Sequence, residues 1–125
     1  MAFGNNYCPR VVKPVAAGQL SALVGSAKPG ETLFVKFASA FCGACQASRH
    51  SIDTALKQSK DCVNVVELDS DVADVVADSY GVKNLPTMVA VREGKVVGRM
   101  EGSGEPAAYL KFFAKFASLN GSGGK

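Results

Sequence analysis

The sequence predicts one α/β domain, in which a central mixed β-sheet of about four to five strands is flanked by about four helices. Strand-like and helix-like segments alternate along the chain as far as Tyr80, and a β-hairpin and a last helix follow. Thr32–Phe37 is largely apolar on both alternating faces and leads directly to two cysteines, Cys42 and Cys45. Such a segment is typical of a strand buried on both sides, so the cysteines should lie where an interior strand ends.

The composition fits a soluble globular protein, with 47% hydrophobic and 20% charged residues among 125. We divide the chain into an N-terminal extension (residues 1–9), a domain (10–119) and a flexible, glycine-rich tail (120–125). The formal net charge of +3 comes from scattered basic residues, so nucleic acid is not an expected partner. No apolar window approaches the roughly 20 residues of a membrane span, and the N-terminus lacks the order of a secretory signal. We therefore expect a cytoplasmic or similarly reducing location and no membrane contact. We also expect a monomer.

The first part of the chain is predicted as strand, helix, strand and helix. Arg10–Lys13 fits a short edge strand that ends at Pro14. Apolar residues at helical spacing predict a helix over Val15–Ser26, which the Lys-Pro-Gly sequence at residues 28–30 stops before the buried strand. From Ala44 onward, apolar residues recur at spacings that match one helix face imperfectly. The second helix should therefore begin near the cysteines.

The next elements are a strand and a short helix. Val63–Leu68 fits a second interior strand, and the polar residues 69–71 should cap the helix after it. That helix should end at Gly81. We expect it to pack through one face, formed by Val72, Val75, Val76 and Tyr80.

The last elements are a hairpin and a terminal helix. Thr87–Val91 and Lys95–Met100 predict two antiparallel strands, the second of which is weakened by Gly98. Pro106 fits the first turn of the last helix. The Asn-Gly sequence at residues 120–121 should end that helix.

The two cysteines occupy positions suited to disulfide exchange. A helix that begins at Cys42 places its unpaired amides and positive dipole end beside that sulfur, which stabilises the thiolate. Since only the thiolate attacks a disulfide, Cys42 is the expected nucleophile. Cys45 lies within reach of the mixed disulfide that would form, so it is the expected resolving thiol. Four cysteines are too few for a disulfide scaffold in this chain, which also favours redox chemistry.

Several segments together resemble the thioredoxin family. They are FCGAC at Phe41–Cys45, LPT at Leu85–Thr87, Gly94 and Gly102, and the family pattern fits without a gap from Lys36 to Gly102. The likeness extends over nearly the whole predicted domain and implies the thioredoxin fold. It also implies a thiol:disulfide oxidoreductase that reduces protein disulfides and needs no bound cofactor. By the same resemblance, a flavoprotein reductase would supply the electrons, and the clients could include peroxidases and reductases.

The resemblance assigns a substrate groove beside the cysteines. It implies that Pro86 is in the cis form and that the backbone at Leu85 pairs with the substrate chain, whereas a plain strand-start proline is the alternative. Gly102 matches the family's glycine at the rim of the groove. Phe41 takes the place of the usual tryptophan, where it would be either a docking platform or a core residue.

Between the cysteines, Gly43 and Ala44 also belong to the expected substrate-binding set, but Ala44 replaces the family's usual proline. It restores an amide hydrogen near Cys42, so we expect a pair more oxidising than the value of about −270 mV known for thioredoxin. His50 replaces a second common proline, which predicts a straighter helix. We assign His50 a structural or surface role and expect no metal site, because a zinc site with both cysteines would lack a fourth ligand.

The largest departure is Lys36, where the family usually has a buried aspartate that assists proton transfer to and from the resolving cysteine. An unpaired lysine in a fully buried strand is costly, so it should be neutral or paired with an acid. Glu67 stands where the family usually has a lysine. We therefore predict a partly buried ion pair behind Cys45, with Glu67 as the proton acceptor and Lys36 favouring the thiolates. In the alternative, Lys36 reaches the surface and takes no part in the chemistry.

The other two cysteines fall outside this site. Cys62 should be a buried small apolar residue. Cys8, near the end of the chain, should be exposed and open to oxidation or dimer formation. Two other functions stay open. One is a disulfide isomerase or oxidant, which Ala44 favours. The other is a binding module or redox-sensitive adaptor without turnover, which the atypical Lys36, Ala44 and Gln46 favour.

Overall fold

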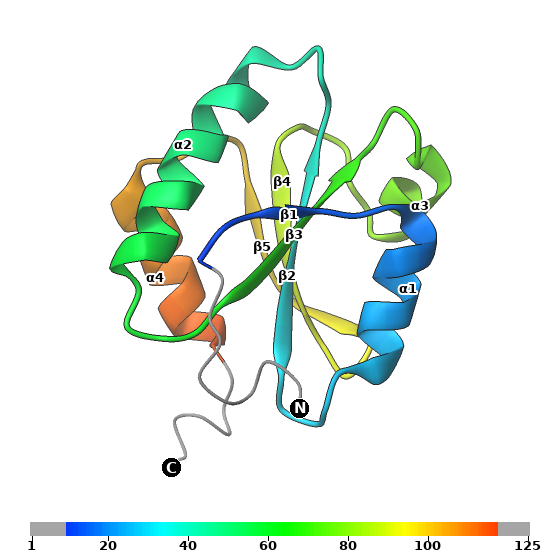
Figure 1. The fold of residues 1–125 in the computed structure, drawn as a ribbon. Helices are drawn as coiled ribbons and strands as arrows, with labels where there is room; N and C mark the ends of the chain where they lie inside the picture. Colours follow the sequence, from blue (N-terminus) through cyan, green and yellow to red (C-terminus); the bar gives the residue numbers. More distant parts are fainter. Residues whose placement is uncertain (1–9, 118–125) are drawn as a thin grey trace.

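A five-stranded mixed sheet forms the centre of the molecule, and helices cover both of its faces (Figure 1). The computed structural model describes residues 10–117, so the predicted extension 1–9 and tail 120–125 lie outside the described residues. The strand order across the sheet is β1-β3-β2-β4-β5, which confirms the predicted fold. The elements in chain order are β1 (Lys13–Pro14), α1 (Ala17–Ser26), β2 (Thr32–Ala38), α2 (Gly43–Gln58), β3 (Asn64–Asp69), α3 (Asp74–Ser79), β4 (Thr87–Arg92), β5 (Lys95–Glu101) and α4 (Pro106–Phe116).

The central strand, β2, sets the position of the site. It pairs in parallel with β3 and antiparallel with β4, so Phe37 near its end lies beside both Leu68 and Thr87. The chain therefore leaves β2 and β3 and enters β4 at the same edge of the sheet, the upper edge in Figure 1. Residues that are far apart in the sequence are brought together at this edge.

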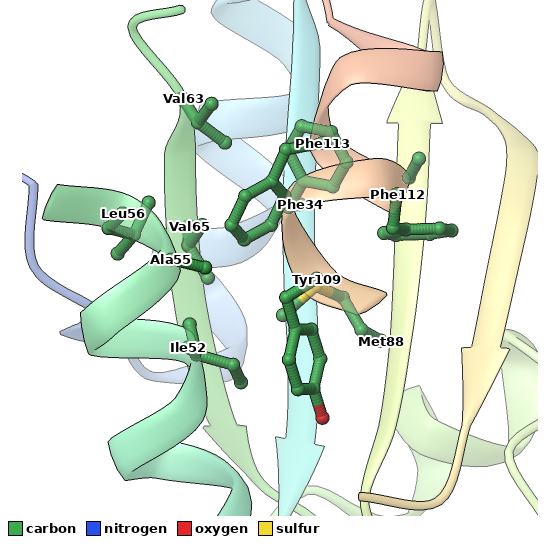
Figure 2. Packing of buried hydrophobic residues seen from close by; sticks show 11 residues of the cluster. Phe34, Ile52, Ala55, Leu56, Val63, Val65, Met88, Tyr109, Phe112 and Phe113 are labelled. Atoms are coloured by element: carbon green, nitrogen blue, oxygen red, sulfur yellow. The ribbon is translucent and has the colours of Figure 1, made fainter. Parts of the chain in front are cut away.

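The sheet face toward α2 and α4 carries the aromatic part of the core. Figure 2 shows Phe34 of β2 near Phe112 and Phe113 of α4, whose ring centroids lie 5.6 and 5.1 Å from its own in edge-to-face contact. Ile52 of α2 belongs to the same cluster. Side chains alternate along a strand, so Lys36, two residues after Phe34, lies on the same face, under α2.

Helices α1 and α3 cover the opposite face (Figure 1). Val35 and Phe37 of β2 form a second buried cluster there, with Leu20 of α1 and Ala77 of α3. This second layer explains why β2 is apolar on both alternating faces, as predicted. All helices described between residues 10 and 117 are too short or too polar to cross a membrane.

The first elements differ from the prediction. β1 has only two residues, Lys13–Pro14, instead of Arg10–Lys13, and it pairs in parallel with β3. The amide of Val15 donates to the carbonyl oxygen of Glu67 at 2.9 Å, which continues the pairing by one residue. Val15 therefore lies outside the helix, and α1 begins at Ala17.

The predicted packing face of α3 is partly wrong. Val72 and Val75 point away from the core, with 81% and 75% of their side chains exposed. Val76 and Tyr80 do pack against the second cluster. Gly81 follows the helix with a φ of +72°, as expected for the residue that ends it. Because α3 has only six residues, it cannot present every apolar position to the sheet.

Two helix ends also differ from the prediction. The N-cap of α3 is Ala73, whose methyl side chain cannot accept a cap bond, and Asp69 instead accepts the amide of Asp71 in the turn before the helix. Helix α4 begins at Pro106 as predicted but ends at Phe116. The predicted end at residues 120–121 lies outside the described residues.

The β4–β5 hairpin confirms the prediction and explains one glycine. Its turn residues Glu93 and Gly94 have φ values of +53° and +77°, as in a two-residue hairpin turn. A Cβ atom at Gly98 would lie only 2.4 Å from the ring of Phe116. Gly98 therefore lets α4 pack closely on β5. The sequence predicted only that this glycine would weaken the strand.

Candidate active site

Cys42 and Cys45 lie at the start of α2, at the upper edge of the sheet. Cys42 is the N-cap residue, with extended backbone angles of φ −108° and ψ 109°, and Cys45 is in the first turn. The two residues form a disulfide with their Cα atoms 5.2 Å apart, within the usual range. Both predicted positions are confirmed.

The two sulfur atoms have different surroundings. Cys42 is half-buried, whereas Cys45 is 3% exposed. The amide of Cys45 donates a hydrogen bond to Sγ of Cys42 at 3.1 Å. In the reduced state this amide and the positive end of α2 would favour the thiolate of Cys42. Cys42 is thus the sulfur that a substrate can reach, and Cys45 is shielded behind it.

The loop before β4 lies beside this helix start because β2 and β4 pair. The partners Phe37 and Thr87 place Pro86 next to the end of β2. The peptide bond between Leu85 and Pro86 is cis, as the resemblance implied. Gly102, at a φ of +80°, donates its amide to the carbonyl oxygen of Pro86 at 2.8 Å. These residues therefore form one unit at the same edge as the cysteines.

The residues around Cys42 are exposed. The side chain of Phe41 is 92% exposed, so the core alternative for this residue is wrong. Gly43 and Ala44 in the first turn of α2 are exposed as well. Helix α2 continues without interruption through the exposed His50. In the described part of the chain, no three His, Cys, Asp or Glu side chains are grouped so as to hold a metal ion.

Behind the disulfide, Lys36 is 1% exposed, so the alternative in which it reaches the surface is wrong. Its Nζ donates to the carbonyl oxygen of Cys45 at 3.0 Å and lies 3.2 Å from Oε2 of Glu67. Lys36 and Glu67 are register partners on β2 and β3, and the predicted ion pair is confirmed. Burial lowers the pKa of the Lys36 ammonium, and the attraction of Glu67 opposes this shift.

Arg49 is a member of the site that the sequence analysis missed. Its guanidinium pairs with Oε1 of Glu67, so the two oxygens of this carboxylate bind two different cations. The Arg49 side chain is about half-exposed, whereas Glu67 is mostly buried. Arg49 follows Cys45 by four residues, and residues at this spacing share one helix face. This spacing could have identified Arg49 from the sequence.

A pocket of about 370 Å³ lies on the same side of the cysteine pair as Glu67. Cys45, Arg49 and Glu67 line it, together with residues of β1 and the end of β2. Both β1 and β3 lie on one side of β2 in the sheet, and β4 with the Pro86 loop lies on the other. The pocket thus approaches the buried Cys45 from the side away from Pro86.

Cys62 does not fit its prediction. It is exposed in the loop before β3 and is part of a disulfide, so it is not a buried apolar residue. Cys8 lies outside the described residues. The exchange chemistry at the helix start therefore rests on Cys42 and Cys45 alone.

Comparison with known proteins agrees with this geometry. The chain matches the Thioredoxin family over residues 13–115. A thioredoxin-like protein of Synechocystis sp. is 31% identical over 100 residues, which cover 80% of this chain and 92% of that protein. A mutant thioredoxin from Halobacterium salinarum superposes with a TM-score of 0.77 at 22% identity, covering 91% of this chain and 97% of that one. A chain from a study of thiol resolution in yeast mitochondrial 1-Cys peroxiredoxin via glutathione/thioredoxin systems gives a TM-score of 0.70 at 18% identity, covering 87% and 99%.

The site and the family match point to the same chemistry. A disulfide within a CxxC sequence, with one sulfur accessible at a helix start and the other behind it, is the redox centre of a thiol:disulfide oxidoreductase. The matched residues include both cysteines, Pro86 and Gly102. The protein is accordingly an enzyme of the disulfide-reductase type, and the chain belongs to the thioredoxin family.

Proposed function

We propose that this oxidoreductase reduces disulfide bonds in protein substrates. The observation that carries the proposal is the asymmetry of the cysteine pair. Cys42 is partly exposed and its sulfur accepts an amide N–H, whereas Cys45 is buried one turn behind it. A large substrate can therefore be attacked only by Cys42, and the resolving step falls to Cys45.

The exchange takes two steps. The Cys42 thiolate attacks one substrate sulfur, the substrate S–S bond breaks, a mixed disulfide forms and the other substrate sulfur leaves as a thiolate. The Cys45 thiolate then attacks Sγ of Cys42, the mixed disulfide breaks and the second substrate sulfur leaves. The two thiol protons of the enzyme are released, and the two substrate thiolates can take up protons from water. Two electrons have moved to the substrate, and the Cys42–Cys45 disulfide has formed.

The substrate chain, in this proposal, lies along the Leu85–Pro86 loop and Gly102, with Phe41 as an apolar platform. The exposure of Phe41 and the bond between Gly102 and Pro86 at the same sheet edge support this placement. Gly43 and Ala44 are small residues on the exposed start of α2, so they leave room for a substrate chain beside Cys42.

In the same proposal, Glu67 accepts the proton of Cys45 and Lys36 favours the thiolates. The support is that Glu67 and Cys45 line one pocket and that Lys36 contacts both residues. The variant Glu67→Gln tests the acceptor role through the pH dependence of insulin reduction. A changed profile is expected, and an unchanged one would remove Glu67 from the proton transfer.

The electron donor in this proposal is a flavoprotein reductase of the thioredoxin-reductase type, as the family resemblance implies. Peroxidases are the first clients to test, because one structural neighbour comes from the study of thiol resolution in a yeast peroxiredoxin. The monomeric state and the cytoplasmic location stay predictions.

Reduction of insulin by dithiothreitol, followed as turbidity, tests the proposal. The wild type should accelerate the reaction, and Cys42→Ser should give the rate of the reductant alone. Cys45→Ser should instead remain linked to its substrate through Cys42, as a mixed disulfide on a non-reducing gel. A wild type that does not exceed the reductant would contradict the proposal and favour a binding module without turnover.

A further inference from the structure

Three charged side chains behind the disulfide form one cluster, the back cluster, which consists of Lys36, Arg49 and Glu67. Each cation binds a different oxygen of the Glu67 carboxylate. Two cations therefore face one anion, and the cluster has a surplus of positive charge. Lys36 is fully buried, so this charge is partly protected from the screening that weakens surface ion pairs.

The back cluster lies next to the resolving cysteine. Lys36 Nζ donates a hydrogen bond to the carbonyl oxygen of Cys45. Arg49 lies one turn after Cys45 on α2, and Cys45 and Arg49 line the same pocket. Two further carboxylates face this region. Asp53 of α2 has the weakest effect among the charges acting on Lys36, and Asp69 of β3 lines the pocket while accepting an amide hydrogen.

We propose that Arg49 is a positioning residue for the resolving step, because it holds Glu67 against Lys36 and adds a second positive charge to the back cluster beside Cys45. A cation close to a thiol favours its thiolate, the form that attacks the mixed disulfide. Without Arg49, one oxygen of Glu67 loses its partner beside Cys45 and the cluster becomes neutral. The resolving thiol would then ionise at a higher pH. The inference rests on the proposed exchange between Cys42 and Cys45.

Stopped-flow reaction of the reduced full chain with excess dithiobis(nitrobenzoate) separates the two cysteines. Attack by Cys42 releases one thionitrobenzoate, and attack by Cys45 on the resulting mixed disulfide releases a second one in a unimolecular phase. The pH profile of the second phase reports the pKa of the Cys45 thiol. Release from the double variant Cys42→Ser/Cys45→Ser gives the background from the other cysteines, which is subtracted.

Arg49→Met should raise the pKa seen in the second phase by about half a unit and slow that phase about twofold at pH 7. Arg49→Lys, which restores a cation, should recover most of the wild-type profile. The matched control is Lys57→Met, which removes an exposed positive charge from the last turn of the same helix. It should leave the second phase unchanged.

Either of two results would overturn the role of Arg49. The pKa of the second phase could be the same in Arg49→Met and the wild type, or Lys57→Met could shift it as far as Arg49→Met does. A wild type without any second phase would contradict the proposed exchange itself, because Cys45 would not be resolving the mixed disulfide. The two failures are therefore distinguishable.

Discussion

The two sides of the cysteine pair relate differently to the thioredoxin pattern. On the side of β4, which we call the front, the cis bond before Pro86 and the glycine at position 102 agree with what the family resemblance implied. On the side of β3, the back cluster places the buried Lys36 where the family usually has an acid, and Glu67 and Arg49 surround it. One half of the site is kept and the other is reversed in charge.

This difference indicates that disulfide exchange requires a fixed backbone arrangement at the front and can work with different arrangements of charge at the back. The front is built from backbone, including the bond of 2.8 Å between the amide of Gly102 and Pro86. A substitution there changes where a substrate chain can lie. The back is built from side-chain charges, which can be arranged in more than one way around Cys45. We therefore expect changes at the front to reduce activity strongly and changes at the back to tune it.

The largest expected effect is at the front, in Gly102→Val. A β-branched residue at this positive φ costs about 1–2 kcal/mol and should displace the backbone beside Pro86. Insulin reduction should fall roughly tenfold, while reaction with a small disulfide, which does not need the groove, should stay within about twofold. Gly94→Val is the matched control, since Gly94 has a φ of +77° in the β4–β5 turn at the other end of these strands. It should lose similar stability and keep its activity, and equal losses of activity in both variants would contradict the groove.

A smaller effect is expected for Phe41→Ala. The exposed ring contributes little to the core, so the free energy of unfolding should change by less than about 0.5 kcal/mol. The KM for insulin should rise about threefold, because an apolar contact with the substrate is lost, while the rate with a small disulfide should not change. Val72→Ala removes another highly exposed apolar side chain, from the segment before α3, and should not alter KM. Unchanged KM in Phe41→Ala would exclude the ring from docking.

The charges of the back cluster should have their clearest effect on the pH dependence of the free energy of unfolding. Burial lowers the pKa of folded Lys36 below 10.5, so the unfolded chain binds more protons between the two pKa values. The free energy of unfolding contributed by this group therefore rises with pH through that window. Urea unfolding at increasing pH, up to the ordinary lysine pKa of 10.5, should show the wild type gaining stability relative to Lys36→Met. The tyrosines with raised pKa values, Tyr80 and Tyr109, are present in both proteins and cancel in the difference. A difference that is constant or falls with pH would contradict a buried, charged Lys36.

Much of the fold could be predicted because its signals are local. The strand β2 was placed within one residue of its observed end, since burial on both faces leaves a continuous apolar sequence. The positions of Cys42 and Cys45 followed from the change to helical spacing. The cis form of Pro86 came from the family resemblance and could not have been obtained from the composition.

The features that were missed depend on contacts between distant segments. The strand β1 has two residues and exists only through its pairing with β3, so no periodicity marks it. The six residues of α3 are too few to define a face, and Val72 and Val75 were wrongly placed in the core. Arg49 reaches Glu67 only because α2 lies over β3, and the disulfide of Cys62 is likewise invisible in local sequence.

The central expectation is that a thioredoxin-type front works together with a positively charged back cluster. A redox titration of the wild type against glutathione buffers tests it directly, with the state of Cys42 and Cys45 determined by mass spectrometry of the alkylated peptide that carries both. We expect one two-electron transition at a potential less negative than about −270 mV, because the amide at Ala44 and the back cluster both favour the reduced form. A potential at or below that value, or a pair that does not change its state, would contradict it.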